Sequence, residues 1–391
     1  MSDPNRVVPG PSAGGIRIPF NRPFMVGAEF DHMRRAYEGL TISEGGPFTT
    51  RCEALLAEIT GAPAVLLTSS CTHALELTAL LLDLGPGDEV IVPSFTFAST
   101  ANAFAMRGAT PVFADVREDT LNIDEARLAG LITPRTRAVV VVHYAGVACA
   151  MEPIVALCDE RKLTLVEDNA HGLLGHYRGT PLGRFGALAT QSFHETKNLT
   201  CGKGGALLLN DLELLPRAEI LREKGTNRRQ FAQGLVDKYT WVDLGSSYLP
   251  PDILSAMLLA QIEARDTIQE ARLRIWNRYH GELAGWADDR GARLPVVPEG
   301  CDHPAHLYYV LLPDNASRNR FLEHMRARGI LSVFHYVPLH LSPMGRRMGG
   351  TEGACPVTES VSGRLARLPL YTGMTAEDQG TVIEAVRAFV P

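Results

Sequence analysis

The sequence of 391 residues lacks the features of several protein classes. It contains no run of about 18 consecutive apolar residues, which a membrane-spanning helix needs. Its first residues are polar and rich in proline and glycine, without the apolar core of a secretion signal. The formal net charge of −6 provides no general basic surface for nucleic acid. We therefore expect a cytoplasmic protein that binds neither membrane nor nucleic acid, with residues 1–16 as a flexible tail.

Cysteine is scarce, and its positions follow no pattern. The seven cysteines form no CxxC pair, and their number is odd. Disulfide frameworks and zinc sites both depend on regular spacing, so we expect free thiols in a reducing compartment and no metal. Because 45% of the residues are hydrophobic and 21% are charged, the chain has an ordinary globular composition. A chain of this length buries enough surface to fold without cross-links.

Between residues 62 and 209, short apolar runs alternate with amphipathic stretches. Most of the runs are almost continuously apolar, which is typical of strands buried on both faces of a mostly parallel sheet. The strands are expected at 64–67, 90–93, 111–114, 138–143, 164–167, 189–193 and 206–209. The helices between them are expected at 72–84, 99–107, 124–131 and 151–161. This alternation predicts an α/β fold with helices on both faces of the sheet.

The pattern changes after Pro250. Residues 252–283 repeat as one long helix rich in Ala, Leu, Glu and Arg. We expect this helix to connect a large domain, residues 17–250, to a small α+β domain within residues 251–391. Further apolar runs and helical patterns follow at 306–312, 318–328, 332–336 and 376–389.

Four segments at the ends of predicted strands carry candidate site residues, because ligands bind at the carboxyl ends of such strands. Ser70, Cys71 and Thr72 lie between a strand and a helix, where hydroxyl and backbone N–H groups can hold a phosphate. A plain helix cap is the alternative interpretation. Phe95 follows the next strand, so it can stack on a planar ring or serve as a core aromatic.

The other two segments supply a carboxylate and an amine. Asp168 ends a buried strand, where a carboxylate is costly unless it meets a cation such as a protonated pyridine nitrogen. A structural ion pair or a helix cap is equally consistent with its position. Lys197 stands among polar residues before the glycines of GKGG, and it can form a Schiff base if its site lowers its pKa. A surface lysine is the alternative, but the order of the four segments favours one shared site.

Several longer stretches of the sequence resemble a known family. SFHETKN (192–198), REKGTNRRQF (222–231) and VFHYVPLH (333–340) are similar to fold-type I aminotransferases that act on nucleotide-linked keto-sugars. With other matching stretches, the resemblance covers nearly the whole chain after residue 16. It implies an enzyme that uses pyridoxal 5′-phosphate (PLP), passes through pyridoxamine 5′-phosphate and forms a homodimer with shared active sites.

The nearest subgroup implies a particular reaction. In this reaction, L-glutamate gives its amino group to carbon 4 of dTDP-4-keto-6-deoxy-D-glucose, and the product is dTDP-4-amino-4,6-dideoxy-D-galactose. A different keto-sugar nucleotide, carbon or stereochemistry is the first alternative. Sugar dehydratases that resemble this family have histidine in place of the lysine, so Lys197 argues against a dehydratase. A non-catalytic or regulatory relative is disfavoured because Lys197 and Asp168 are both present and no helix-turn-helix is appended.

The resemblance also implies roles for residues around the cofactor. Lys197 would carry the cofactor, Asp168 would pair with the ring nitrogen, and Phe95 would stack on the ring. His171 stands where relatives usually have a glutamine that touches the ring hydroxyl, and imidazole can donate that hydrogen bond. The cofactor phosphate would be held by Cys71, Thr72 and Ser192.

Other residues would act on the substrate or across the dimer. His340 matches a histidine near the substrate in relatives. In relatives, an asparagine of the partner subunit often binds the cofactor phosphate. Ser247 stands in the place of that asparagine, and Leu249 replaces the arginine of the same stretch. Whether the partner subunit contacts the phosphate therefore stays an open question. A sugar nucleotide brings two phosphates, which need local cations in a chain of net charge −6. We expect at least one member of a basic cluster to bind this diphosphate: Lys224, Arg228 or Arg229.

Overall fold

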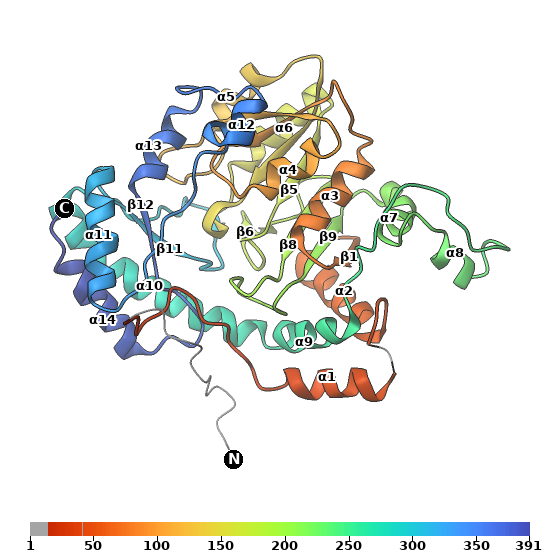
Figure 1. Ribbon diagram of the computed structural model, residues 1–391, viewed down its shortest axis with the longest axis horizontal. Coiled ribbons are helices and arrows are strands. Elements are labelled where there is room, and N and C mark those ends of the chain that lie inside the picture. The colour runs from red at the N-terminus through yellow and green to blue at the C-terminus, as the bar shows by residue number, and fades with distance from the viewer. Residues whose placement is uncertain (1–14, 41) are drawn as a thin grey trace.

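The computed structural model describes residues 15–40 and 42–391 (Figure 1). A seven-stranded sheet forms its centre, in the order β1-β9-β8-β5-β4-β2-β3. All neighbouring strands are parallel except that β9 is antiparallel to both β1 and β8, which confirms the predicted mostly parallel sheet. Residues 1–14, most of the expected flexible tail, lie outside the described residues. The strands are β1 (Ala64–Thr68), β2 (Glu89–Pro93), β3 (Thr110–Ala114), β4 (Thr136–Val142), β5 (Thr164–Asp168), β8 (Leu188–Ser192) and β9 (Gly205–Leu209).

Helices cover both faces of this sheet, as the sequence predicts, because alternate strand residues point to opposite sides. On β2, Val90 and Val92 pack with α4 (Ser99–Ala105), whereas Ile91 packs with α6 (Met151–Arg161). Around β1 and β9, α3 and α7 lie in one apolar cluster, and α2 and α9 lie in another. These helices are α2 (Pro47–Thr60), α3 (Cys71–Leu81), α7 (Leu215–Arg222) and α9 (Asp252–Glu263).

The prediction of a single long helix over residues 252–283 is wrong. The segment forms two helices, α9 and α10 (Arg265–Arg290), separated at Ala264. The first packs on α1 (Glu29–Glu38) and α2, and its apolar residues join the cluster beneath the sheet. The second places Ile275, Tyr279 and Leu283 in the core of the C-terminal lobe. No glycine or proline marks the break, so helical periodicity alone does not reveal it.

The C-terminal lobe packs helices around a small antiparallel sheet (Figure 1). Its strands are β11 (Tyr308–Leu311) and β12 (Leu365–Leu368). The run predicted at 332–336 forms only a single bridge, between Val333 and Arg367. The helices of the lobe are α11 (Asn315–Ala327), α13 (Pro356–Arg364) and α14 (Ala376–Arg387), whereas the short α12 (Pro343–Arg347) packs on residues 339–341 instead. The boundary between the two predicted domains, at residue 250, stays a prediction.

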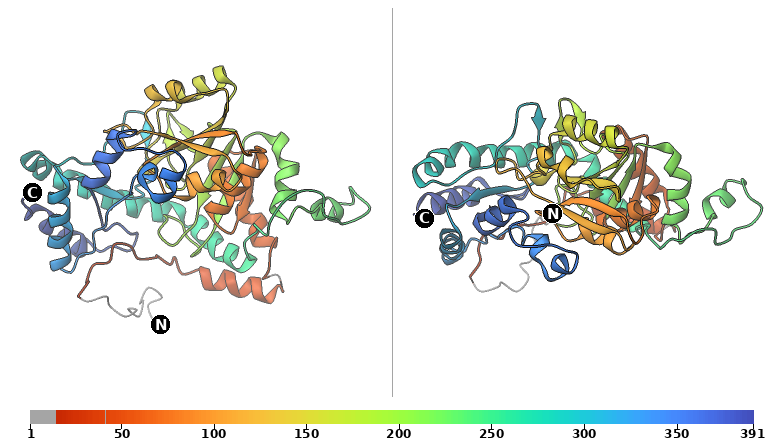
Figure 2. Two further views of the ribbon diagram at one scale, coloured as in Figure 1. Left: turned by 45° about the horizontal axis from the view of Figure 1, so that its top comes forward. Right: turned by 90° about the horizontal axis from the view of Figure 1, so that it is seen from above.

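An arm formed by residues 223–247 stands out from the body of the protein, as Figures 1 and 2 show from three directions. It contains one short helix, α8 (Arg228–Ala232). The arm follows α7 and returns to the body just before α9. Among the described helices, none has the length and apolar character needed to cross a membrane.

Candidate active site

A cavity of about 630 Å³ lies where the sheet meets the C-terminal lobe. The last residues of three neighbouring strands line it: Val142 of β4, Asp168 of β5 and Ser192 of β8. Residues of the lobe, such as His306 and Arg367, line the opposite wall. The cavity therefore lies at the carboxyl ends of parallel strands, where the fold class predicts a ligand.

Lys197 reaches this cavity from the loop after β8. Its backbone N–H donates to the carbonyl of His194 at 2.8 Å, which forms a tight turn and directs the loop to the cavity. Burial lowers the pKa of Lys197 to about 8, while Cys71 and Asp168 oppose this change. A substantial fraction of the amine is therefore neutral near physiological pH, as a nucleophilic lysine needs.

Asp168 is buried and also faces the cavity. Its Oδ2 accepts a hydrogen bond from Thr100 Oγ1 at 2.7 Å, and its Oδ1 accepts one from the backbone N–H of Ala170 at 3.3 Å. Burial raises the pKa of Asp168, whereas the Thr100 bond and the nearby Lys197 favour the carboxylate. Asp168 has no direct ion-pair partner among the described residues, so a cation bound in the cavity would stabilise it.

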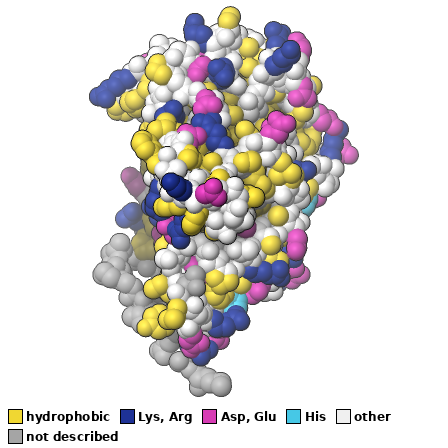
Figure 3. Space-filling view, turned by 90° about the vertical axis from the view of Figure 1, so that its right-hand side faces the viewer, with side chains coloured by type: hydrophobic (Ala, Val, Ile, Leu, Met, Phe, Trp, Pro, Cys, Tyr) yellow, Lys and Arg dark blue, Asp and Glu magenta, His cyan; other side chains and the backbone are white. Residues whose placement is uncertain are grey.

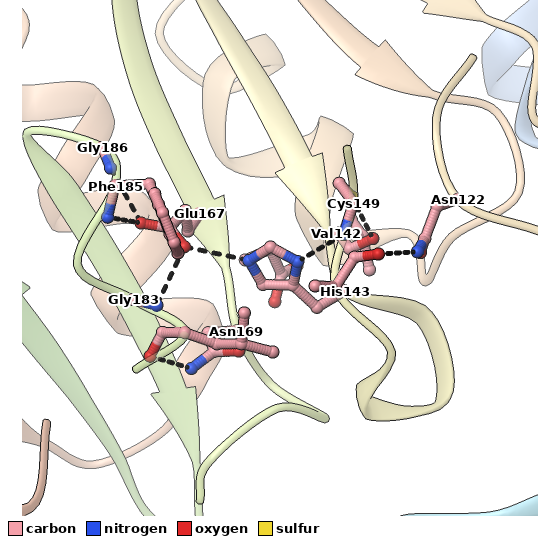
Figure 4. A network of polar contacts seen from close by, with 12 residues as sticks. Asn122, Val142, His143, Cys149, Glu167, Asn169, Gly183, Phe185 and Gly186 are labelled. Atoms are coloured by element: carbon pink, nitrogen blue, oxygen red, sulfur yellow. Dashed lines mark hydrogen bonds and ion pairs between the residues drawn. The ribbon is translucent and has the colours of Figure 1, made fainter. Parts of the chain in front are cut away.

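The preceding carboxylate, Glu167, takes part in a buried hydrogen-bond network (Figure 4). Its two oxygens accept backbone N–H bonds from residues 183, 185 and 186 at 2.7–2.8 Å, and a bond from His143 Nε2 at 2.9 Å. His143 Nδ1 in turn accepts from the backbone N–H of Cys149, so the proton of this imidazole sits on Nε2. The network joins the ends of β4 and β5 and so fixes the position of Asp168 beside it. The sequence does not distinguish these two adjacent carboxylates, but their hydrogen bonds do.

The residues of the turn between β1 and α3, predicted to bind a phosphate, have different roles in the structure. Ser70 caps α3, because its Oγ accepts from the N–H of His73 at 3.1 Å, and it does not line the cavity. Cys71 and Thr72 do line it, and Thr72 Oγ1 lies 2.8 Å from Ser99 Oγ. With Ser192, the turn thus offers hydroxyl groups and the free N–H groups of a helix start, a suitable phosphate site.

The placement of Phe95 requires a correction. Phe95 is only 1% exposed and packs against Tyr144 and Tyr336, with ring centroids 5.1 and 5.6 Å apart, so it is a core aromatic. Phe97, which is 61% exposed, lines the cavity instead. Both phenylalanines follow the end of β2, where the alternation of a strand no longer applies, so the sequence alone does not show which one faces the ligand.

Histidines form a second wall of the cavity, and the sequence revealed only one of them. His171 stacks on His306, with centroids 4.3 Å apart, and His335 lies in the same group. Burial lowers the pKa of all three well below the usual range, so their rings are neutral. His171 Nδ1 is buried without a partner, whereas Asn198 engages His306 and Tyr144 engages His335. His306 and His335 lie more than 130 residues from His171, so no local pattern could join them.

Five other predicted site residues lie outside the cavity lining. His340 is fully buried, with Ser94 Oγ 2.6 Å from Nδ1 and Glu359 Oε1 2.9 Å from Nε2, so both ring nitrogens are occupied. The other four belong to the arm and its base and form polar contacts with Glu44 or Glu219: Lys224, Arg228, Arg229 and Ser247. Within this chain, the structure therefore does not bring these residues to the candidate site.

The residues of the cavity fit PLP. Lys197 supplies the amine and Asp168 the anion for a protonated ring nitrogen. Phe97 supplies an aromatic surface, and the unpartnered His171 Nδ1 is free to meet the ring hydroxyl. The hydroxyls of Thr72 and Ser192 suit the phosphate. In the part of the chain that the structure describes, no cluster of residues has the composition of a metal site.

Comparisons with known proteins agree with this chemistry. The profile of the DegT/DnrJ/EryC1/StrS aminotransferase family matches residues 25–387. The spore coat polysaccharide biosynthesis protein SpsC of Bacillus subtilis is 32% identical over 381 residues, 95% of this chain and 97% of SpsC. The aminotransferase TlmJ from Streptoalloteichus hindustanus is 34% identical, with a TM-score of 0.87 over 95% of this chain and 98% of TlmJ. The putative sugar aminotransferase Spr1654 from Streptococcus pneumoniae, in its PMP form, is 27% identical, with a TM-score of 0.89 over 95% and 98% of the two chains.

Proposed function

Because this chain belongs to the DegT/DnrJ/EryC1/StrS aminotransferase family, we propose that it transfers the amino group of L-glutamate to a nucleotide-linked keto-sugar. Aminotransferases of this family use PLP, and the solved neighbours include PLP and PMP forms of one protein. The observation that carries the proposal is the meeting of Lys197 and Asp168 in one cavity at the ends of β5 and β8.

We propose that Lys197 binds the cofactor covalently and moves the proton. When bound, PLP supplies a carbonyl group that takes the amino group and a ring that withdraws electrons. Lys197 Nζ, released when the substrate amine takes its place, would carry a proton between the substrate carbon and the cofactor carbon that holds the amino group. Its pKa of about 8 supports this task, because the amine can both accept and donate near neutral pH.

The remaining cavity residues would orient the cofactor. Asp168 would keep the ring nitrogen protonated, and Phe97, in place of Phe95, would cover one face of the ring. His171 would meet the ring hydroxyl through its unpartnered Nδ1. The phosphate would be held by Cys71, Thr72 and Ser192.

For the acceptor, we propose dTDP-4-keto-6-deoxy-D-glucose, aminated at carbon 4 to give dTDP-4-amino-4,6-dideoxy-D-galactose. This choice rests on the resemblance of SFHETKN and REKGTNRRQF to the subgroup with that activity. An acceptor with another nucleotide, carbon or stereochemistry is the alternative, since it would use the same cofactor residues.

We further propose a homodimer in which the arm of each subunit approaches the cavity of its partner. The arm exposes several large apolar side chains, among them Leu235 at 70% and Trp241 at 73%, which is costly for a free surface. In Figure 3, which faces the side from which the arm protrudes, hydrophobic side chains lie among Lys and Arg. In such a dimer, cations of the arm such as Lys224, Arg228 and Arg229 could reach the sugar diphosphate.

The proposed reaction is tested by product identification. The PLP-loaded protein is incubated with L-glutamate and a panel of keto-sugar nucleotides, and the products are identified by NMR. We expect an amino-sugar nucleotide together with one equivalent of 2-oxoglutarate, with dTDP-4-keto-6-deoxy-D-glucose as the preferred acceptor. PLP-loaded protein that forms neither 2-oxoglutarate from L-glutamate nor an amino-sugar from any acceptor in the panel would refute the proposed transfer.

A further inference from the structure

Arg367 is an unpaired cation in the wall of the cavity. It belongs to β12, where its backbone is held on one side by Tyr309 and on the other by Val333. Its guanidinium lies over the ring of Phe20, 4.6 Å from the centroid, and Nη2 donates to the carbonyl of Phe334 at 3.2 Å. Nε is buried without a hydrogen-bond partner, and no ion pair joins Arg367 to a carboxylate among the described residues.

Several other arginines of the described part of the chain have more polar partners than Arg367. Arg117 and Arg217, which are half-exposed, each bond two carboxylates. The buried Arg272 donates to two backbone carbonyls. Arg367 keeps one such bond, and burial lowers its pKa, although an arginine stays charged under ordinary conditions. A desolvated charge without a partner costs free energy, so an anionic ligand would stabilise this wall.

Arg367 is the cation of the cavity lining that is available to a substrate. Of the described residues that line the cavity, only Lys197 and Arg367 are lysine or arginine. Lys197 is used by the cofactor in the proposed function. The histidines His171, His306 and His335 are neutral, and Arg367 contributes to lowering the pKa of each of them and of Lys197. Arg367 therefore acts electrostatically on the groups that surround the reacting amine.

We propose that Arg367 binds a carboxylate of the amino-acid donor, an inference that rests on the proposed transaminase activity. A guanidinium matches a carboxylate through two parallel N–H bonds, either from Nε and Nη2 or from Nη1 and Nη2. Nε of Arg367 is buried without a partner, and Nη2, which donates one N–H to Phe334, has a second N–H to offer. A diphosphate is a poorer match, because it carries more charge than one arginine neutralises. The apolar flank of Phe20, Phe334 and Leu368 also favours a small anion that carries a single charge.

The two half-reactions separate donor binding from acceptor binding. The first half-reaction starts from PLP-loaded Arg367→Leu, and L-glutamate converts the cofactor to its amine form. We expect kcat/KM of this half-reaction to fall at least about 100-fold. The return half-reaction, started from enzyme loaded with pyridoxamine phosphate and supplied with a keto-sugar nucleotide, should change less than threefold. Arg367→Lys should give an intermediate loss, because it keeps the charge but not the two parallel bonds.

A matched control is Arg318→Leu. Arg318 also lies beside Phe334, 5.9 Å from the ring centroid, and it has no ion-pair partner among the described residues, but it does not line the cavity. Its removal should leave both half-reactions unchanged. The visible absorbance of bound PLP and the thermal midpoint show whether each variant folds and loads.

Donor analogues identify the carboxylate and exclude a general structural effect. L-Glutamine lacks the side-chain carboxylate, and L-glutamate α-amide lacks the α-carboxylate. The penalty of Arg367→Leu should shrink to less than about fivefold for the analogue that lacks the bound carboxylate and persist for the other. An equal penalty for all three donors, no penalty for glutamate, or a loss confined to the acceptor half-reaction would overturn the inference. If wild-type enzyme converts no amino acid, the proposed function itself fails, which is a different result.

Discussion

At the scale of residues, Lys197 and Asp168 show why local sequence could predict the centre of the site. Asp168 ends one buried strand and Lys197 lies in the loop after another, and parallel strands bring such positions to one edge of the sheet. The predicted pair does meet in the cavity. The opposite wall could not be predicted in this way, because His306, His335 and Arg367 come from the distant C-terminal lobe. Their positions depend on how that lobe packs, which no local motif encodes.

The lowered pKa of Lys197 predicts the pH dependence of cofactor loading. Only the neutral amine attacks the PLP carbonyl, and burial shifts the pKa from 10.5 down to about 8. The rate of covalent loading of apoenzyme should therefore rise with pH and level off above about 8. Stopped-flow absorbance measures this rate. Lys197→Ala should abolish covalent loading and lower turnover by several orders of magnitude, whereas Lys203→Ala, on an exposed lysine of the same loop, should have no effect.

For Asp168, the decisive variant is Asp168→Asn, which keeps the shape of the side chain and removes its charge. We expect kcat to fall by roughly two orders of magnitude or more, since the neutral amide no longer favours a protonated ring nitrogen. PLP should also dissociate more readily. Steady-state kinetics and equilibrium dialysis check the two effects, and an unchanged kcat would reduce Asp168 to a structural role.

At the scale of elements, the strands were predicted well because most of them are short apolar runs bounded by turn residues. The helix over 252–283 was mispredicted, because two helices that bury different faces share one continuous periodicity. The position of Phe97 relative to Phe95 also depends on how the chain leaves β2. Such details are set by tertiary contacts and not by local propensity.

The buried network of Glu167 and His143 should hold the ends of β4 and β5 in place. Glu167→Gln puts an amide among four donors, so one or more hydrogen bonds are lost. We expect a loss of about 3 kcal/mol in the free energy of unfolding, measured on apoenzyme with urea. The control is Glu152→Gln on α6, where an exposed ion pair with Arg178 is worth less than about 1 kcal/mol. Equal stability of the two variants would contradict a positioning role for Glu167.

Gly205 at the start of β9 should be required for the turn between β1 and α3, which we propose holds the cofactor phosphate. A Cβ at this position would lie 2.3 Å from the backbone nitrogen of Cys71, so Gly205→Ala must displace the turn. We expect weaker PLP binding, by at least about tenfold, and a lower thermal midpoint. Gly85→Ala is the control, because a Cβ there meets nothing within 4 Å. Titration of apoenzyme with PLP checks the prediction, which fails if both variants bind equally.

At the scale of the whole molecule, the protruding arm is the feature that bears on whether the protein is a monomer or a dimer. Residues 222–248 are polar and rich in Arg and Lys, and the structure places most of them outside the body of the protein (Figure 2). What the arm contacts cannot be predicted from one chain, because its exposed apolar residues and its cations have binding partners only if another molecule packs against the arm. The proposed dimer therefore stays a prediction.

Polar substitutions on the arm should weaken the proposed dimer. Leu235→Ser with Trp241→Ser removes two of its largest exposed apolar side chains, so their contribution to association is lost. We expect wild-type protein to sediment as a dimer and the double variant to shift toward monomer at micromolar concentration. Phe30→Ser on α1, which is also exposed but lies outside the arm, is the comparison variant. A fully active wild-type monomer at the assay concentration would refute the shared site.

The central claim, that this protein carries an amino group on PLP held by Lys197, is tested most directly by one titration. PLP-loaded enzyme is mixed with L-glutamate in the absence of acceptor, and its visible absorbance and the released 2-oxoglutarate are both measured. The account predicts that the absorbance of the lysine-bound cofactor disappears, with one 2-oxoglutarate per subunit, and returns when a keto-sugar nucleotide is added. Absorbance that persists with saturating glutamate and no 2-oxoglutarate would contradict it.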